Sequence, residues 1–384
     1  MSAALIDLVS VGAQDVYITG DPQVSFFRQN YKRHTNFSIK PERIDYVGTF
    51  KSGNEVSIPI RSKGDLLSYV WIENANINSR SSDASIFQES KSSPGFGVEA
   101  ALPMPSPTEF SLWIGGQEVT KLDTLFINTV HNTLYNESSA KASCAMTTRD
   151  GGDNASNGSY IIPFFFSEDW TKSLPLVGLQ YHEVEIRIKC RNGPFDLSSS
   201  TRPKVYGSYV YVDTDEREFF ANGEHELLIT QTQHQPMSGS DTSIDLSYFN
   251  HPVKAVHIAS NNKSSFFPNG TPYTFTDASM FINGVPLFEN MTHEYHRNVV
   301  PSRHCSILNT TVDLEEIYTW PFCLTMNKSQ PTGTLNFSRI DNAKININYT
   351  GSVTNAKIDM IRAYAVNYNI LRIKNGMGGI AFGN

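Results

Sequence analysis

The chain has 384 residues, of which only 18% are charged, and a formal net charge of −7. This length allows two domains that each bury a core, and the acidic balance argues against direct contact with nucleic acid. No apolar run has the length of a membrane span, and no basic region followed by an apolar core opens the chain, so we expect neither a membrane helix nor a signal peptide.

The first 24 residues are too short for a domain and are expected to form an arm. Residues 28–34 (RQNYKRH) are basic and are typical of a solvated or intersubunit surface. Val56, Ile58 and Ile60 alternate with polar residues, which predicts a half-buried strand. The denser apolar run at residues 66–72 predicts a strand that is buried on both sides or lies at the centre of a sheet.

A hairpin followed by a helix is predicted next. Residues 111–119 (SLWIGGQEV) alternate around Gly115 and Gly116, which suit the positive φ angles of a type I′ turn. A helical rhythm follows at Leu122, Leu125, Phe126 and Val130. Ser, Gly and Pro dominate residues 79–109, and Ser, Asn, Gly and Ala dominate residues 136–159, so two long exposed loops are expected on either side.

Three further strands complete the first half of the chain. Residues 160–166 (YIIPFFF) are typical of a buried strand, residues 184–190 (VEIRIKC) alternate strictly, and residues 206–212 form a third apolar run. The polar stretch at residues 213–218 (DTDERE) predicts the boundary between two domains.

The second half of the sequence repeats this order. Residues 279–287 (SMFINGVPL) form a hairpin around Asn283 and Gly284, and a helical rhythm follows. That rhythm consists of Phe288, Met291, Tyr295 and Val299. Three later segments also repeat earlier ones: 320–324 corresponds to 162–166, 343–349 to 184–190, and 363–366 to 209–212. The number of positions between the two copies falls along the chain, from 168 at the hairpins to about 158 and then 154. The pattern predicts a duplicated fold whose loops have diverged.

Many short strands with long connections predict an all-β protein. The expected architecture is two tandem eight-stranded jelly-roll β-sandwiches, a double jelly roll, with short helices in the loops. Its predicted parts are an N-terminal arm (1–24), a first jelly roll (25–213), an interdomain linker (214–224), a second jelly roll (225–373) and a Gly-rich C-terminal tail (374–384).

No group of residues predicts catalysis, a metal site or a cofactor site. Asp213 and Asp215 have the spacing of a metal-binding pair, but their flanking charges favour a linker. His293 and His296, with His304 and Cys305 nearby, lack the HExxH spacing and are interpreted as surface residues. The glycines of residues 376–383 do not open a helix after a strand, so they do not form a phosphate-binding loop.

The cysteines and the glycosylation sequons bear on the cellular compartment. Cys144, Cys190, Cys305 and Cys323 have no CxxC spacing and are predicted to be free thiols in a reducing compartment. Eleven Asn-x-Ser/Thr sequons occur, and without secretion most of them are expected to stay unmodified.

Motifs at the start, middle and end of the chain resemble those of the major capsid proteins of the nucleocytoplasmic large DNA viruses. The opening motif is residues 12–22 (GAQDVYITGDP) with 26–37 (FFRQNYKRHTNF). The middle motif is residues 213–217 (DTDER) with 224–229 (EHELLI). The closing motif is residues 364–373 (YAVNYNILRI) with 375–379 (NGMGG).

This resemblance implies a structural virion protein that is not an enzyme. It implies homotrimers with a pseudo-hexagonal outline, in which three chains present six similar sandwiches and build an icosahedral shell. The implied partners are other copies of the chain, minor capsid and penton proteins, and an inner viral membrane nearby, without direct nucleic acid. Assembly is expected in the host cytoplasm. The alternatives are a minor or vertex capsid paralogue and a jelly-roll carbohydrate-binding or carbohydrate-active protein.

Overall fold

The computed structural model describes residues 10–51, 53–73, 107–138, 159–190, 203–237, 241–260, 274–306, 317–349 and 361–383. The predicted loops at 79–109 and 136–159, except for their ends, lie outside these residues, as does Cys144. The chain forms two units, residues 1–36 and residues 37–384. Within the described residues, no helix is both long and apolar enough to cross a membrane.

The first unit contains one helical turn and no buried side chain among its described residues. The turn is α2 (Val16–Thr19), and the Gly12 amide donates a hydrogen bond to the Asp15 carboxylate at 2.8 Å. The aromatic rings of Phe26 and Phe27 are 94% and 99% exposed. The unit therefore has no core of its own.

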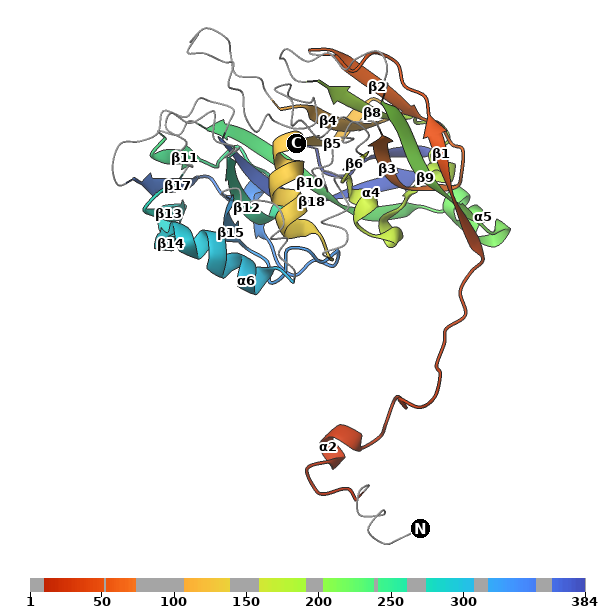
Figure 1. The fold of residues 1–384 in the computed structure, drawn as a ribbon, viewed down its shortest axis with the longest axis horizontal. Coiled ribbons are helices and arrows are strands. Elements are labelled where there is room, and N and C mark those ends of the chain that lie inside the picture. Colours follow the sequence, from red (N-terminus) through yellow and green to blue (C-terminus); the bar gives the residue numbers. More distant parts are fainter. Residues whose placement is uncertain are drawn as a thin grey trace, which may run out of the picture. The chain divides into compact units, whose positions relative to one another are not determined.

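The second unit begins with a sandwich of two antiparallel sheets (Figure 1). One sheet has the order β1-β9-β3-β6, with β7 also paired to β3, and the other has the order β2-β8-β4-β5. The strands are β1 (Phe37–Ile44), β2 (Glu55–Ile60), β3 (Leu66–Glu73), β4 (Glu109–Ile114), β5 (Gln117–Asp123), β6 (Ser159–Ile162), β7 (Leu174–Pro175), β8 (Val184–Lys189) and β9 (Lys204–Val212).

A second sandwich follows with the same topology. Its sheets have the orders β10-β18-β12-β15 and β11-β17-β13-β14, so each strand corresponds to the one nine places earlier. The strands are β10 (His225–Met237), β11 (Ser243–Asp245), β12 (Pro252–Ser260), β13 (Asp277–Ile282), β14 (Val285–Thr292), β15 (Ile317–Pro321), β16 (Leu335–Asn336), β17 (Ala343–Asn348) and β18 (Ile361–Lys374). The predicted double jelly roll is confirmed, including the central position of β3 in its sheet.

The strand register corrects one part of the predicted duplication. Val70 pairs with both Ile162 and Gly207, and Val256 pairs with both Trp320 and Ala365. Both central strands carry a bulge at the matching place, between Leu67 and Tyr69 and between Val253 and Ala255. The equivalent of Tyr206 is therefore Tyr364, an offset of 158 residues, so the predicted offset of 154 at this strand was wrong.

The two predicted hairpin turns are confirmed. Ile114 pairs with Gln117 and Ile282 pairs with Val285, so each turn has two central residues. Their φ angles are 58° and 80° at Gly115 and Gly116, and 49° and 82° at Asn283 and Gly284. Glycine and asparagine occupy this left-handed region at low cost, which explains their place in the turns.

The helices after the hairpins begin later than the sequence rhythm predicted. Leu122 belongs to β5, and Phe288 and Met291 belong to β14. The first helix contains a wide π-helical segment, η2 (Phe126–Tyr135), and the second contains η6 (Tyr295–Val299) and α6 (Val300–His304). The apolar residues at the end of each strand happen to continue the helical spacing of the apolar residues in the helix that follows. The sequence therefore predicted that each helix begins too early.

Two other predicted segments differ from the structure. The strand predicted at residues 160–166 ends at Ile162, because Pro163 has no amide for the ladder, and Phe165 begins a helix. The charged residues after Asp213 form a helix whose first turn is acidic and whose first residue, Thr214, donates its amide to the Asp213 carboxylate at 2.7 Å. The short helices are α4 (Phe165–Glu168), η4 (Trp170–Lys172), η5 (Leu176–Gly178), α5 (Thr214–Asn222) and η7 (Phe337–Arg339).

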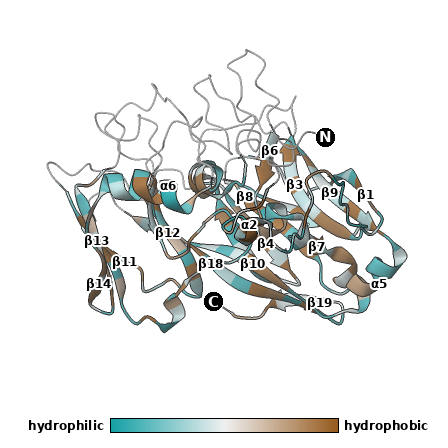
Figure 2. Cartoon of the chain, turned by 90° about the horizontal axis from the view of Figure 1, so that it is seen from below, coloured by the Kyte–Doolittle hydropathy of each residue, from teal (hydrophilic) through white to brown (hydrophobic). Residues whose placement is uncertain are grey.

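The C-terminal segment extends the second sandwich. Strand β19 (Met377–Ile380) pairs with β18 inside the stretch predicted as a tail. Strands β10 and β18 lie between the other strands of the two sandwiches (Figures 1 and 2). The apolar cluster of the first sandwich accordingly includes Tyr364 and Val366 of β18, whereas Ala363 and Ala365 of the same strand belong to a separate cluster inside the second sandwich.

Candidate functional site

The two sandwiches meet along a contact surface, here called the seam, which is centred on a buried ion pair. The guanidinium of Arg362 on β18 donates from Nη1 to Oδ2 of Asp123 on β5 at 2.8 Å, and their side chains are 5% and 1% exposed. The Tyr364 hydroxyl donates to the same carboxylate at 2.9 Å. A buried charge is tolerated when it is paired and hydrogen-bonded in this way, so the geometry fixes one sandwich against the other.

Other polar contacts extend the seam on both sides of this ion pair. The Gln231 side-chain amide donates to the backbone carbonyl of Val119, and its own carbonyl accepts from Asn369 at 3.0 Å. The Tyr135 hydroxyl and His257 Nε2 lie 2.6 Å apart, and the other ring nitrogen of His257 lies 2.9 Å from the Thr319 hydroxyl. These groups belong to elements of both sandwiches, so the seam has a specific register.

Burial keeps the imidazoles at the seam neutral. Burial, together with the positive charge of the nearby Lys254, lowers the pKa of His257 to about 3. Burial also lowers the pKa of His131 to about 4. Both rings are therefore uncharged at neutral pH, and His257 serves as a hydrogen-bonding side chain without a charge.

A second group of charges lies beside these rings. The Lys254 ammonium donates to the carbonyl of Met326 at 3.2 Å and lies 4.6 Å from the centre of the Tyr135 ring. Glu168 of the first sandwich pairs with Lys172 at 2.7 Å and accepts from the Thr230 hydroxyl of the second. Burial favours a raised pKa for Glu168, but Lys254 and Lys172 outweigh it and the net pKa is lowered. The carboxylate thus stays charged and links the two sandwiches.

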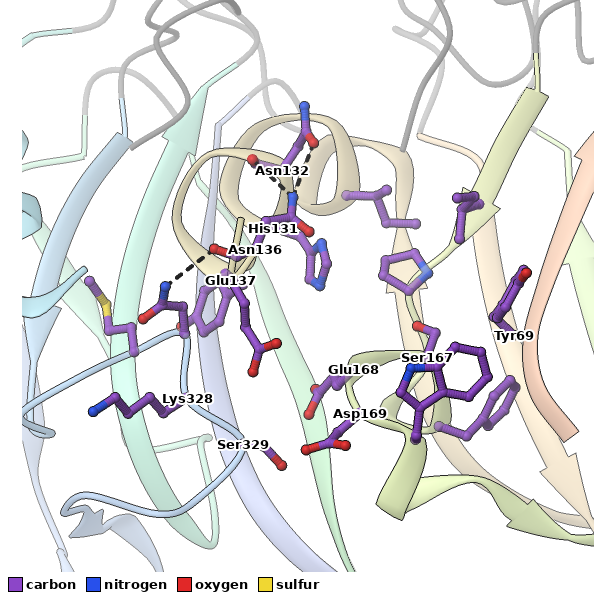
Figure 3. A pocket seen from close by; sticks show the side chains of 18 of the residues that line it. Tyr69, His131, Asn132, Asn136, Glu137, Ser167, Glu168, Asp169, Lys328 and Ser329 are labelled. Carbon is purple, nitrogen blue, oxygen red and sulfur yellow. Dashed lines mark hydrogen bonds between the residues drawn. The ribbon is translucent and has the colours of Figure 1, made fainter. Parts of the chain in front are cut away.

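A pocket of about 560 Å³ opens at the seam (Figure 3). Glu137, Glu168 and Asp169 direct their carboxylates toward its lower part, and Tyr69 and Trp170 form an aromatic wall with ring centres 6.2 Å apart. Within the described residues, no group of three or more His, Cys, Asp or Glu side chains has the arrangement of a metal site. The pocket is lined by apolar, acidic and amide side chains, together with Lys254, Lys328 and the His131 ring.

The C-terminal segment closes the seam at its other end. The Tyr181 amide donates to the carbonyl of Gly376 at 2.9 Å, and His182 Nδ1 lies 2.8 Å from the carbonyl of Gly378. A Cβ atom on Gly378 would lie 2.6 Å from a methyl group of Leu179. Glycine therefore permits close approach of the tail to the first sandwich, a structural use rather than a phosphate-binding one.

The residues considered as metal ligands from the sequence do not come together. Asp213 caps α5, and Asp215 lies in the first turn of that helix. His296 is fully buried with its ring centre 4.3 Å from that of Trp320, so its interpretation as a surface residue was wrong. His304 Nδ1 lies 2.8 Å from the carbonyl of Cys323. Cys190, Cys305 and Cys323 are free thiols, as predicted.

The seam was not predicted from the sequence. Arg362 and Asp123 lie 239 positions apart, and neither belongs to a motif. One local signal was present, because a charged residue inside the apolar stretch of β18 is unusual unless it is paired. The partner of that residue was not readable from the sequence.

Family comparisons agree with this architecture over both sandwiches. Residues 25–214 match the model for the major capsid protein N-terminus, and residues 216–379 match that for the large eukaryotic DNA virus major capsid protein. The fold is similar to the capsid of Paramecium bursaria Chlorella virus 1, with a TM-score of 0.71, 24% identity and coverage of 94% of this chain and 100% of that chain. It is also similar to the Faustovirus major capsid protein, with a TM-score of 0.64, 10% identity and 95% of each chain covered.

Curated relatives match along the whole chain. The major capsid protein of Paramecium bursaria Chlorella virus 1 is 29% identical over 464 residues, with 100% of each chain covered. That of Pyramimonas orientalis virus is 32% identical over 419 residues, again with 100% of each chain covered. The chain therefore belongs to the family of large eukaryotic DNA virus major capsid proteins, which are structural components of the virion and not enzymes.

Proposed function

We propose that three copies of this chain form a pseudo-hexagonal capsomer and that these capsomers tile an icosahedral shell. The observation that carries the proposal is the identical strand order of the two sandwiches, which are joined by the seam into one unit. A trimer of such units presents six similar sandwiches, so it can occupy a position with six neighbours in a hexagonal lattice. A head-to-tail contact closes into a ring when its rotation is a simple fraction of a full turn.

The seam supplies the rigidity that such a building block needs. The Asp123–Arg362 pair and the Tyr135–His257 contact fix the angle between the sandwiches, and Tyr364 and Val366 of the second sandwich pack in the apolar cluster of the first. A flexible joint would let the six corners of a trimer vary in position. A rigid seam therefore favours closed trimers over open chains.

The N-terminal arm is proposed to bind other components of the particle. The residues that follow the arm within the first unit carry the exposed aromatic rings of Phe26, Phe27 and Tyr31, with the basic residues Arg28, Lys32 and Arg33 beside them. Apolar side chains without a core gain free energy when another surface covers them. Minor capsid and penton proteins, with an inner membrane nearby, are the proposed surroundings, and the host cytoplasm is the proposed place of assembly.

The predicted division of the chain remains part of this proposal. The proposed units are an arm (1–24), two jelly rolls (25–213 and 225–373), the linker between them (214–224) and a tail (374–384). The alternatives of a minor or vertex paralogue and of a carbohydrate-binding or carbohydrate-active jelly roll receive no support from a specific feature of the described residues.

The mass of the purified protein in solution tests the proposal. Native mass spectrometry and light scattering at micromolar concentration should give three times the mass of one chain. Electron microscopy of the same sample should show hexagonal outlines. A stable monomer at all concentrations up to those of a capsid assembly reaction would contradict it.

A further inference from the structure

The pocket at the seam has the size and the lining of a small-molecule site. Its volume of about 560 Å³ falls within the range of about 300–1,000 Å³ that is usual for ligand pockets. Such sites combine aromatic and apolar walls with a few polar groups. The apolar side chains of this lining are Ile127, Ile161, Pro163, Phe166 and Met326. The pocket therefore offers an apolar chamber, and its other residues determine which ligand fits.

An exposed tryptophan lines this pocket. Trp170 is 59% exposed, although tryptophan is highly buried on average. The centre of its ring lies 6.2 Å from that of Tyr69, and the two ring planes are inclined at 74°. The two rings thus form a corner with two aromatic sides. Aromatic corners and cages of this kind recognise alkylammonium ions, because the face of each ring attracts a positive charge.

Asp169 places a negative charge beside this corner. It directly precedes Trp170 in the chain, and its carboxylate is directed toward the lower part of the pocket, as is that of Glu137 (Figure 3). Its Oδ1 accepts the Thr171 amide at 3.1 Å as the cap of η4. Within the described residues, Asp169 forms no ion pair with a lysine or an arginine. A cation bound at the corner would therefore meet a carboxylate that has no cationic partner within the chain.

The remaining charges at the pocket leave this carboxylate to a ligand. Glu168 is already balanced, because Lys172 pairs with it at 2.7 Å and Lys254 lies near it. The Lys254 ammonium also donates to a backbone carbonyl at 3.2 Å. The Lys328 side chain extends away from Glu168 and Asp169 (Figure 3). The charge of the site thus favours a cationic ligand over an anionic one.

The segment that carries Asp169 and Trp170 is held in place by its own hydrogen bonds. The Ser173 hydroxyl donates to the Trp170 carbonyl at 2.7 Å, and the Ser167 hydroxyl donates to the Phe164 carbonyl at 2.7 Å. Phe164 is itself buried in the core of the first sandwich. Because these groups are ordered by the fold, little conformational entropy is lost when a ligand binds to them.

We propose that the pocket binds an alkylammonium ion, with its cationic head between the Trp170–Tyr69 corner and the Asp169 carboxylate and its apolar body against Ile127 and Ile161. The aromatic faces and the carboxylate both attract the head, and the apolar wall covers the body. A quaternary head suits the site, because aromatic corners need no hydrogen bond from it. A free quaternary amine and the headgroup of a choline lipid share this chemistry. This binding site is additional to the proposed role of the chain in shell building.

Isothermal titration calorimetry of the purified protein at neutral pH, where the His131 ring at the pocket is uncharged, tests the ligand class. Three probes separate the two contributions. Benzyltrimethylammonium has a cationic head and an apolar body, choline has the same head without that body, and the neutral tert-butyl analogue of choline has its shape without its charge. Benzyltrimethylammonium is expected to bind most tightly and choline more weakly, and the neutral analogue is expected not to bind at millimolar concentration.

Two variants test the assigned residues. Trp170→Ala should weaken benzyltrimethylammonium binding by about 3- to 30-fold, and Trp170→Phe should restore most of the loss. Asp169→Asn should also weaken binding, although asparagine preserves the cap of η4. Tyr248→Ala and Asp215→Asn are the matched controls, because both residues are exposed and lie outside the pocket. Both controls should bind as the wild type does, and all variants should keep its circular dichroism.

Flotation with lipid vesicles distinguishes the two sources of the ligand. Binding to phosphatidylcholine vesicles, but not to phosphatidylglycerol vesicles, that benzyltrimethylammonium competes away would assign the site to a choline lipid. Calorimetric binding without such flotation would assign it to a free quaternary amine. The site would be overturned by an absence of heat with benzyltrimethylammonium at millimolar concentration, by equal affinity for choline and its neutral analogue, or by unchanged affinity in Trp170→Ala.

Discussion

Arg362 and Asp123 form a buried ion pair, with Nη1 and Oδ2 2.8 Å apart, that joins β18 of the second sandwich to β5 of the first. The Asp123 carboxylate also accepts the backbone amide of Phe126 at 2.7 Å, at the start of the helix. One side chain thus fixes both the seam and the entry into η2. Because of this dual role, the loss of Arg362 is expected to weaken the connection between the sandwiches.

Replacing Arg362 tests the energetic weight of this pair. Arg362→Met leaves the carboxylate buried without its cation, and removing one partner of a buried pair costs about 3–5 kcal/mol of unfolding free energy. Arg372→Met on the same strand is the control, because Arg372 and its partner Glu226 are 57% and 55% exposed. That exposed pair should contribute less than about 1 kcal/mol. Urea unfolding at fixed protein concentration measures both, and equal losses would contradict the central role of the seam.

Valine at the turn glycines is expected to strain the backbone without causing a steric clash. A Cβ at Gly116 or Gly284 meets no atom within 4 Å, but the φ angles are 80° and 82°. Gly116→Val and Gly284→Val should each lose about 1–2 kcal/mol or more, because a branched residue disfavours the left-handed region. Gly116→Asn should be milder, since asparagine already occupies this region at position 283. Thermal unfolding and trimer yield are the measurements, and wild-type values for both valine variants would refute the prediction.

A larger side chain at Gly378 in the C-terminal tail is expected to clash with the first sandwich. Gly378→Val would push the tail against Leu179, where a Cβ already lies within 2.6 Å, whereas a Cβ at Gly383 meets nothing within 4 Å. Overpacking of this kind costs about 1–3 kcal/mol. We expect Gly378→Val to lower stability and to release the tail for proteolysis, and Gly383→Val to do neither. Equal protease sensitivity of the two variants would show that the tail contact is unimportant.

The buried His257 predicts loss of stability in acid. Its folded pKa of about 3 lies below the value of an unfolded histidine, so the unfolded chain binds a proton first as the pH falls. The stabilising effect is complete above about pH 6.5 and declines below it, by about 2 kcal/mol at pH 5. His257→Gln should remove that part of the dependence. Urea unfolding at pH 7 and pH 5 is the test, and an unchanged difference between the two pH values would contradict the assignment.

The sequence predicted those parts of the fold that depend on neighbouring residues. The turn glycines and Asn283 revealed the hairpins because few residues accept positive φ. Val184, Ile186 and Ile188 revealed β8 because their inward positions alternate with charges. Because the second half of the sequence repeats these patterns in the same order, the order of the strands was predicted for both sandwiches. Local patterns of this kind need no partner from elsewhere in the chain.

The parts that were missed depend on contacts between distant segments. His296 was interpreted as exposed because a polar ring on a short helix usually is, yet Trp320 and Phe275 enclose it. The burial of β12 on both sides reflects the first sandwich and not a property of β12 alone. Tyr209 and Val212 were matched to the wrong residues because two apolar strands align almost equally well in several registers. Only the pairing of β3 with β9 and of β12 with β18 resolves that ambiguity.

The most direct test of the account is a cryo-electron microscopy reconstruction of the purified oligomer. The account predicts a three-fold ring of six sandwiches, alternately first and second, with a hexagonal outline. A single chain, or an oligomer without three-fold symmetry, would contradict it.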